Sequence, residues 1–194
     1  PEMQLRQNDE ETVYDMIQQA FERLEQFVEE DKISSYGIAT WDGLRVDPQQ
    51  PQYLSLEDVY DRAERAGGKD HHFQAVQLPF NLGMSEALTK ANQPLDEEPL
   101  TPLEACNRLD LTVCTSASLL QGKLTDRLPE EIQEDLEEFD KDVHRSLQFT
   151  RSAPGVTSAL VGMKTPEHVR ENLELGNYPP YEEDVFKERF LREV

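Results

Sequence analysis

The sequence has few cysteines and few basic residues, and it contains no long hydrophobic run. Its 194 residues include two cysteines and 19 Lys+Arg against 40 Asp+Glu, so the formal net charge at pH 7 is −21. The two cysteines, Cys106 and Cys114, are too few to staple a fold of this size. No stretch approaches the roughly 20 apolar residues of a membrane span, and no charged-then-apolar signal peptide opens the chain. We therefore expect a soluble cytoplasmic protein with no membrane partner.

The shortage of basic residues also excludes whole classes of partner. A protein this acidic repels DNA, RNA and anionic lipid, because their binders carry basic patches. The acidic runs at 22–31 and 130–138 either hold a hard cation or form solvated helix faces. The solvated face is the simpler interpretation, since charge runs seldom converge on one point.

The large negative charge has a consequence for stability. It destabilises the compact state by self-repulsion unless salt screens it. Our hypothesis is that the chain is adapted to a saline cytoplasm. The melting temperature should then rise steeply with molar KCl, and a flat response would contradict the hypothesis.

Hydrophobic spacing predicts a helix followed by four strand–helix pairs. Four short apolar runs have the length of strands, and most are followed by a capped, helically spaced segment. We expect strands over 33–40, 72–78, 111–116 and 156–161, and helices over 11–31, 55–66, 85–91, 101 onward, 129–149, 165 onward and 182–193.

This order of elements predicts the fold class. Apolar strands separated by helices form parallel sheets with right-handed crossovers. Four such units fit either a small doubly wound sheet or half of an eight-stranded barrel. A flavodoxin-like sheet usually has five strands and starts with one, whereas this chain starts with a helix. We therefore expect an α/β fold in which the chain forms about half of a (β/α)8 TIM barrel.

Candidate binding residues lie where the predicted strands end, because parallel α/β folds bind ligands beyond the carboxyl ends of their strands. Gln77 is an amide in an apolar strand, and either a neighbouring strand or a ligand satisfies it. Thr165 and Pro166 begin a helix directly after Lys164. This combination is either plain helix capping, the simpler interpretation, or an anion site made by free N–H groups and a cation.

The sequence offers no catalytic motif and no metal motif. His71 and His72 are adjacent in a strand and point to opposite faces, so we expect no metal site there. Cys106 and Cys114 have the surroundings of small core residues. The sequence contains no GxGxxG, P-loop or zinc spacing. The residues alone predict a nucleotide- or phosphate-sized site at the strand ends and no evident catalytic machinery.

Four segments together resemble the aldo-keto reductase family over nearly the whole chain. They correspond to the second half of that family's barrel, strands five to eight, and the last segment is the most specific. The segments are 24–41 (LEQFVEEDKISSYGIATW), 73–82 (FQAVQLPFNL), 113–124 (VCTSASLLQGKL) and 154–173 (PGVTSALVGMKTPEHVRENL).

The resemblance implies reduction of an aldehyde or ketone by hydride transfer from NADPH, or sometimes NADH. It implies that Thr40 and Gln77 hold the nicotinamide carboxamide and that Ser116 lies against the ring, where the family often has an aromatic residue. The remaining positions follow by segment: Leu119, Gln121 and Lys123 over the pyrophosphate; Gly162, Met163, Lys164, Thr165 and His168 at the ribose and 2′-phosphate; Glu171 and Asn172 near adenine; and Trp41, Phe80 and the 83–100 loop beside the carbonyl substrate.

The sequence departs from the family in its phosphate-binding residues. Strong NADPH binders often have Lys and Arg where this chain has Gly162 and His168, and imidazole cannot copy the bidentate contacts of a guanidinium. Lys164 compensates in our interpretation. We expect NADP(H), with NAD(H) as the alternative, and a ratio of dissociation constants near one would contradict the preference.

The family's catalytic Tyr, Lys, Asp and His belong to the first half of its barrel, and none of the six tyrosines here has the matching context. Many relatives end the fourth strand with His-Asn-Pro-Glu, and this chain begins Pro1-Glu2. We therefore expect residues 1–194 to be the C-terminal half of one barrel domain, with no catalytic residue of its own and inactive without the N-terminal half as partner. The alternatives are a non-catalytic NADP(H)-sensing subunit and a self-assembling half-barrel without a nucleotide.

Overall fold

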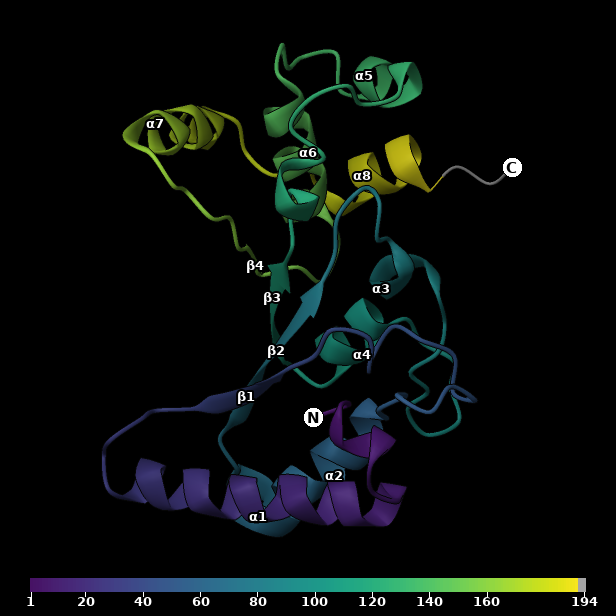
Figure 1. Cartoon of the computed structure of the whole chain (residues 1–194), viewed down its shortest axis with the longest axis vertical. Helices are drawn as coiled ribbons and strands as arrows, with labels where there is room; N and C mark the ends of the chain where they lie inside the picture. The colour runs from purple at the N-terminus through teal and green to yellow at the C-terminus, as the bar shows by residue number, and fades with distance from the viewer. Residues whose placement is uncertain (192–194) are drawn as a thin grey trace. The chain divides into compact units, whose positions relative to one another are not determined.

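A computed structural model describes residues 1–191, and it alternates helices with short strands (Figure 1). The strand order is β1-β2-β3-β4, and the β1–β2 and β3–β4 pairs are parallel. The predicted α/β fold with a parallel sheet is therefore confirmed. The strands are β1 (Tyr36–Ala39), β2 (Phe73–Pro79), β3 (Thr112–Ser116) and β4 (Ser158–Ala159).

The chain divides into two compact units, which we describe separately. Unit 1 comprises residues 1–78 and 86–113, and unit 2 comprises 79–85 and the chain from 114 onward. The helices of unit 1 are α1 (Glu10–Glu29), α2 (Leu56–Gly67), α3 (Glu86–Thr89) and α4 (Pro102–Arg108). Those of unit 2 are α5 (Glu130–Asp135), α6 (Asp142–Ser152), α7 (Pro166–Glu174) and α8 (Glu183–Phe190).

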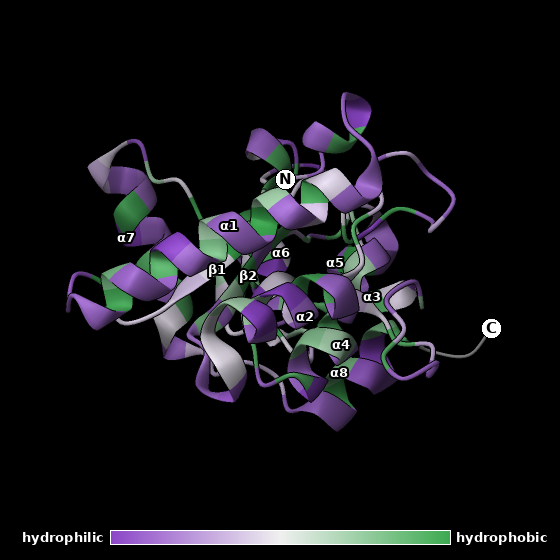
Figure 2. Cartoon of the chain, turned by 90° about the horizontal axis from the view of Figure 1, so that it is seen from below, coloured by the Kyte–Doolittle hydropathy of each residue, from purple (hydrophilic) through white to green (hydrophobic). Residues whose placement is uncertain are grey.

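Side-chain caps begin the helices of unit 1 where the sequence predicts them. Ser55 accepts a hydrogen bond from the Asp58 N–H at the start of α2. Thr101 and Glu104 form a reciprocal capping box at the start of α4. Figure 2 shows hydrophobic bands between hydrophilic ones along α1. The buried residues of this helix recur at helical spacing and therefore share one face; they are Val13, Tyr14, Ile17, Phe21 and Glu25. The predicted starts of α2 and α4 are confirmed.

The register of β1 against β2 fixes the strand ends of unit 1. Ala39 lies opposite Gln77, and the Thr40 N–H donates to the Gln77 carbonyl over 2.9 Å. Gly37 is required by close packing, because a Cβ there would lie 2.1 Å from the Ala75 carbonyl oxygen. Thr40 is thereby held at the carboxyl end of the strand pair.

The predicted helix over 129–149 is wrong, because α5 and α6 are separate helices. Leu136 and Phe139, in the break between them, are both buried in the core cluster of unit 2 with Leu175. The backbone is not helical at Leu136 (φ −129°, ψ 41°) or at Lys141 (φ −113°, ψ 133°), so α5 ends before the first and α6 begins after the second. The break also frees the Leu136 carbonyl, which accepts a hydrogen bond from Arg145 Nε over 3.2 Å.

The last elements also differ from their predicted lengths. β4 covers two residues rather than 156–161, because its partner β3 ends at Ser116. The last hydrogen bond between the two strands runs from the Leu160 N–H to the Thr115 carbonyl. α8 ends at Phe190, and the predicted helix end near Glu193 lies outside the described residues. Within residues 1–191, no helix has the length and apolar character needed to cross a membrane.

Candidate functional site

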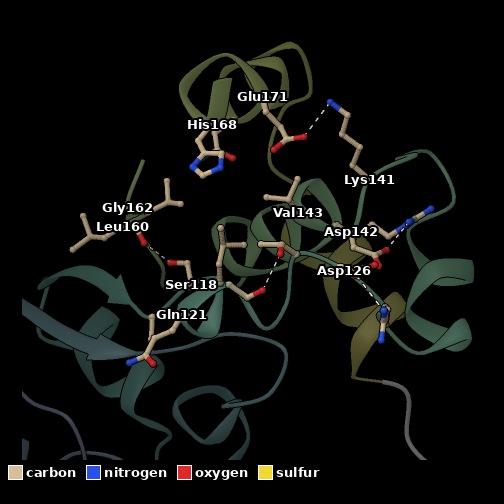
Figure 3. A pocket seen from close by; sticks show the side chains of 18 of the residues that line it. Ser118, Gln121, Asp126, Lys141, Asp142, Val143, Leu160, Gly162, His168 and Glu171 are labelled. Carbon is tan, nitrogen blue, oxygen red and sulfur yellow. Dashed lines mark hydrogen bonds and ion pairs between the residues drawn. The ribbon is translucent and has the colours of Figure 1, made fainter. Parts of the chain in front are cut away.

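Unit 2 contains a cavity of about 960 Å³, which is within the usual size of small-molecule sites. Its walls are the loop 117–127 after β3, the start of α6 at 140–145, and the stretch 160–172 from the end of β4 into α7 (Figure 3). Two of these walls directly follow strands. The cavity therefore lies at the position where parallel α/β folds bind ligands.

Six of the thirteen predicted cofactor residues line this cavity. They come from the loop after β3 and from the stretch that leads into α7. They are Leu119, Gln121, Gly162, His168, Glu171 and Asn172.

The other seven lie elsewhere. Thr40 and Gln77 belong to unit 1. Within the described part of the chain, the cavity lining does not include Ser116, Lys123, Met163, Lys164 or Thr165.

The start of α7 is built from the sequence signals that predicted it. Thr165 accepts a hydrogen bond from the His168 N–H over 3.3 Å, and Pro166 occupies the first helical position. His168 and Glu171 are three residues apart, so they share a face of the helix, and both project toward the cavity (Figure 3). The capping is confirmed, and an anion at the remaining N–H groups stays a prediction.

The loop after β3 has an unusual backbone. Ala117, Leu120 and Gln121 have φ angles of 57°, 45° and 56°, and Gly122 has a φ of 85°. Left-handed conformations are unfavourable for residues with a Cβ, and such strain concentrates at functional sites. Ser118, which is buried, ties this loop to the end of β4 by donating to the Leu160 carbonyl over 2.7 Å.

Apart from Glu171, sequence reasoning missed the charged residues of the cavity. Among its described lining residues are three basic ones, Arg127, Lys141 and Arg145, and four acidic ones, namely Asp126, Asp140, Asp142 and Glu171. Hydrogen bonds from Lys141 to Glu174 and Glu171 raise the pKa of the lysine. The available signal was that these basic residues stand within one of the most acidic stretches of a chain with only 19 Lys+Arg.

In unit 1, the predicted site residue Thr40 has a buried hydroxyl group without a hydrogen-bond partner. It is 7% exposed, and its Oγ1 has no hydrogen-bond partner among the described residues. Buried hydroxyl groups are almost always paired. A ligand group beyond the end of β1 would supply the missing partner.

The two predicted substrate residues differ in exposure. Trp41 is 48% exposed. Its backbone N–H donates a hydrogen bond to Glu2 Oε1 over 2.6 Å, and its carbonyl accepts one from Arg45 Nε over 3.0 Å. Phe80 is fully buried and stacks on Phe149 at 5.5 Å between ring centroids. Its predicted place beside a substrate stays a prediction, as does the place of Ser116, whose carbonyl accepts from the Phe80 N–H.

The histidine pair takes part in other contacts. His72 Nδ1 lies 2.7 Å from Glu25 Oε2, and the His71 ring packs edge-on against Tyr60. No cluster of three or more metal-ligating side chains occurs within residues 1–191. Cys106 is buried, and burial raises the pKa of its thiol to about 12.

Among the solved structures that share this architecture are aldo-keto reductases. The thermostable aldo-keto reductase Tm1743, solved with the inhibitor epalrestat, matches 89% of this chain with a TM-score of 0.59 and 15% identity. The aldo-keto reductase AKR11C1 from Bacillus halodurans matches 87%, with TM-scores of 0.54 (holo) and 0.56 (apo) and 15% identity. Over the part that it covers, the chain has an aldo-keto reductase fold.

This likeness is one of fold and of partial length. The chain spans 53% of the first structure and 54% of the second, about half of each aldo-keto reductase. No family model matches the sequence, and no curated protein matches it significantly. The resemblance predicted from the four sequence segments is thus confirmed for the fold, while activity and cofactor are matters for proposal.

Proposed function

We propose that the chain is the C-terminal half of the (β/α)8 barrel of an NADP(H)-dependent aldo-keto reductase. In this role it supplies the cofactor-binding strand ends for reducing an aldehyde or ketone to an alcohol. The observation that carries the proposal is the cavity of unit 2, because one space gathers residues implied to contact the pyrophosphate, ribose and adenine. The fold of the solved aldo-keto reductases supports the same function.

The residues present fit an adenine dinucleotide. The cavity volume suits a small-molecule ligand, and the capped start of α7 offers N–H groups and a favourable dipole for a phosphate. His168, Glu171 and Asn172 add donors and acceptors along the same wall. In unit 1, the unpaired hydroxyl of Thr40 suits the carboxamide of a nicotinamide.

Each segment then has a binding task. Gly162 and His168 would hold the ribose and its 2′-phosphate, and Glu171 with Asn172 would hold adenine. The loop after β3 would cover the pyrophosphate, and Thr40 with Gln77 would orient the nicotinamide. When bound, NADP(H) supplies the hydride that reduces the carbonyl carbon. The proton donor would come from the N-terminal half of the barrel, the partner in this proposal, in a cytoplasmic enzyme.

A non-catalytic NADP(H)-sensing subunit is the second candidate. It is favoured by Ser116, a small residue where the family often stacks an aromatic ring on the nicotinamide. A sensor would bind the cofactor without holding the nicotinamide firmly enough for hydride transfer. The two candidates share the adenosine site and differ in turnover.

Binding and turnover of the complete protein separate the candidates. NADPH is titrated against the protein by its fluorescence, and its oxidation is then followed after a generic aldehyde is added. A reductase binds and turns over, a sensor binds with little turnover, and no binding of NADPH or NADH contradicts both. Asn172→Ala should weaken binding, whereas the control Asn177→Ala, an exposed amide outside the cavity lining, should not.

A further inference from the structure

Three basic residues line the cavity of unit 2, and their pairings differ. Arg145 is 12% exposed and donates to Asp142 Oδ1 over 2.8 Å as well as to the Leu136 carbonyl. Arg127 is 91% exposed and paired with its neighbour Asp126. Arg145 therefore holds the start of α6 in place, and Arg127 lies almost entirely in solvent.

Lys141, the third, is the basic residue that can change partners. Its Nζ lies 3.0 Å from Glu174 Oε2 and 3.3 Å from Glu171 Oε1, both on α7. The lysine is 45% exposed and the two carboxylates 55% and 36%. Ion pairs this exposed contribute little to stability, so exchanging the carboxylates for another anion costs little.

Lys141 is also not the main attachment of α7. His144 is buried, and its Nε2 lies 2.7 Å from the Glu171 carbonyl oxygen, so it bonds the α7 backbone directly. Thr165 caps the start of the same helix. The side chain of Lys141 is therefore available without loss of the helix position.

The charge balance of the chain creates a need for such a cation. A dinucleotide with its phosphates is a polyanion, the chain carries a net charge of −21, and the cavity itself holds four acidic side chains. The stretch 160–172 contributes Gly162 and His168 to the cavity lining but no lysine or arginine. A lysine ammonium is a compact charge with three donors on a flexible stem, and Lys141 lines the cavity from the position just before α6.

We propose that Lys141 is a phosphate-binding residue that exchanges Glu171 and Glu174 for a phosphate group of the nucleotide. The two carboxylates compete with the ligand for the lysine and lower its affinity. This inference rests on the proposed function and adds a residue that the family resemblance does not assign. In this inference Lys141 is the main basic residue that binds phosphate. Lys164 is exposed and lies outside the cavity lining.

The first test removes the charge. Lys141→Met should raise the dissociation constant for NADPH about tenfold, the effect of losing one charge-assisted hydrogen bond. The matched control is Lys187→Met on α8, whose lysine pairs with Glu183 over 2.5 Å and lies outside the cavity lining, and it should leave NADPH binding unchanged. Lys164→Met should weaken binding less than Lys141→Met. Equal binding by wild type and Lys141→Met would overturn the inference.

The second test removes the competitor and has the opposite sign. Glu174→Gln should tighten NADPH binding about threefold, because the lysine then loses one anionic partner. If Lys141 only tied α7 to α6, the same change would loosen the helix and weaken binding, which would overturn the inference. Glu183→Gln removes a carboxylate paired with Lys187 on α8 and should change nothing.

Comparison of the two dinucleotides identifies which phosphate is bound. A loss of affinity confined to NADPH in Lys141→Met assigns the lysine to the 2′-phosphate, and an equal loss for NADPH and NADH assigns it to the pyrophosphate. Either result supports phosphate binding.

Failure of the proposed function is distinguishable. If wild type binds neither dinucleotide, that function fails, and inorganic pyrophosphate becomes the probe. Binding of pyrophosphate that weakens in Lys141→Met still supports the inference, and no binding, or binding independent of Lys141, overturns it.

Discussion

The turn after β1 and the loop after β3 both leave the carboxyl end of a strand, but they are held in different ways. In the first, buried charged side chains fix the backbone: Glu2 binds the Trp41 N–H and Arg45 binds the Trp41 carbonyl. In the second, residues 117–122 close on themselves through turns with left-handed backbone angles. Charged contacts hold one segment, and local strain shapes the other.

The difference separates two tasks expected at a binding site. A turn fixed by buried ionic groups can hold Thr40 and Trp41 in one position, as orientation of a reacting group requires. A loop with left-handed angles at residues other than glycine stores backbone strain, and such strain is concentrated at ligand-binding segments. The contrast is tested by altering each region in turn.

The largest effect is expected at Arg45. Its guanidinium is 5% exposed and lies 2.7 Å from Glu86 Oε2 while also binding the Trp41 carbonyl. Arg45→Met leaves that carbonyl without its donor, and we expect the free energy of unfolding to fall by about 2 kcal/mol. Urea denaturation measures the loss, and fluorescence of Trp41, the single tryptophan, should shift to the red.

The matched change in the other region is Arg127→Met, which removes an almost fully exposed guanidinium. It should leave the urea midpoint and the tryptophan spectrum unchanged. If Arg45→Met behaved like Arg127→Met, the turn after β1 would not depend on buried charge, and the contrast would fail.

A smaller, pH-dependent effect is expected from Glu25 in unit 1. Burial alone would raise the pKa of this carboxyl, but hydrogen bonds from His72 and Tyr36 outweigh burial and lower it below 4.5. A carboxyl whose pKa is lower in the folded than in the unfolded protein stabilises the fold at pH values above its pKa in the unfolded protein. This stability is lost as the pH falls through its pKa in the folded protein. Glu25→Gln should therefore cost about 1 kcal/mol at neutral pH.

The pH dependence itself is the check on Glu25. Urea titrations of wild type and Glu25→Gln should converge as the pH falls below about 4.5. A difference that stayed constant down to pH 3 would show that the carboxylate charge is not what matters. The control Glu22→Gln alters an exposed residue of the same helix and should show no such convergence.

The smallest effect, and one of opposite sign, is expected at Gln121. Its φ of 56° suits glycine, so Gln121→Gly should stabilise the protein by about 0.5–1 kcal/mol. The same substitution at Gln74, an exposed residue in β2, should destabilise it, because glycine weakens strands. Thermal melts measure both, and destabilisation at both positions would show that the loop after β3 is not strained.

Local signals in the sequence predicted much of this fold. Ser55, Thr101 and Thr165 each precede a helix and each accepts the capping hydrogen bond that its position implies. The main error arose where periodicity outweighed a weaker local signal. Leu136, Phe139 and Val143 keep helical spacing through segment 129–149, so periodicity predicts one helix, whereas the break between α5 and α6 contains Asp140, a residue of low helix propensity.

The candidate site divides in the same way. Gly162 and Leu119 were implied by the family resemblance, and both line the cavity. Lys141 was missed because its partners Glu171 and Glu174 lie about 30 residues further along the chain, and only the fold brings them together. The unpaired hydroxyl of Thr40 is likewise a property of packing that the sequence cannot show.

The central claim is that the cavity of unit 2 binds the adenosine half of NADP(H), and calorimetric titration with 2′,5′-ADP tests it most directly. This probe carries adenine, the ribose and the 2′-phosphate but no nicotinamide. The account predicts one molecule bound per chain, with affinity reduced by His168→Ala and by Asn172→Ala and unchanged by Asn177→Ala. No binding, or binding that neither cavity variant weakens, would contradict it.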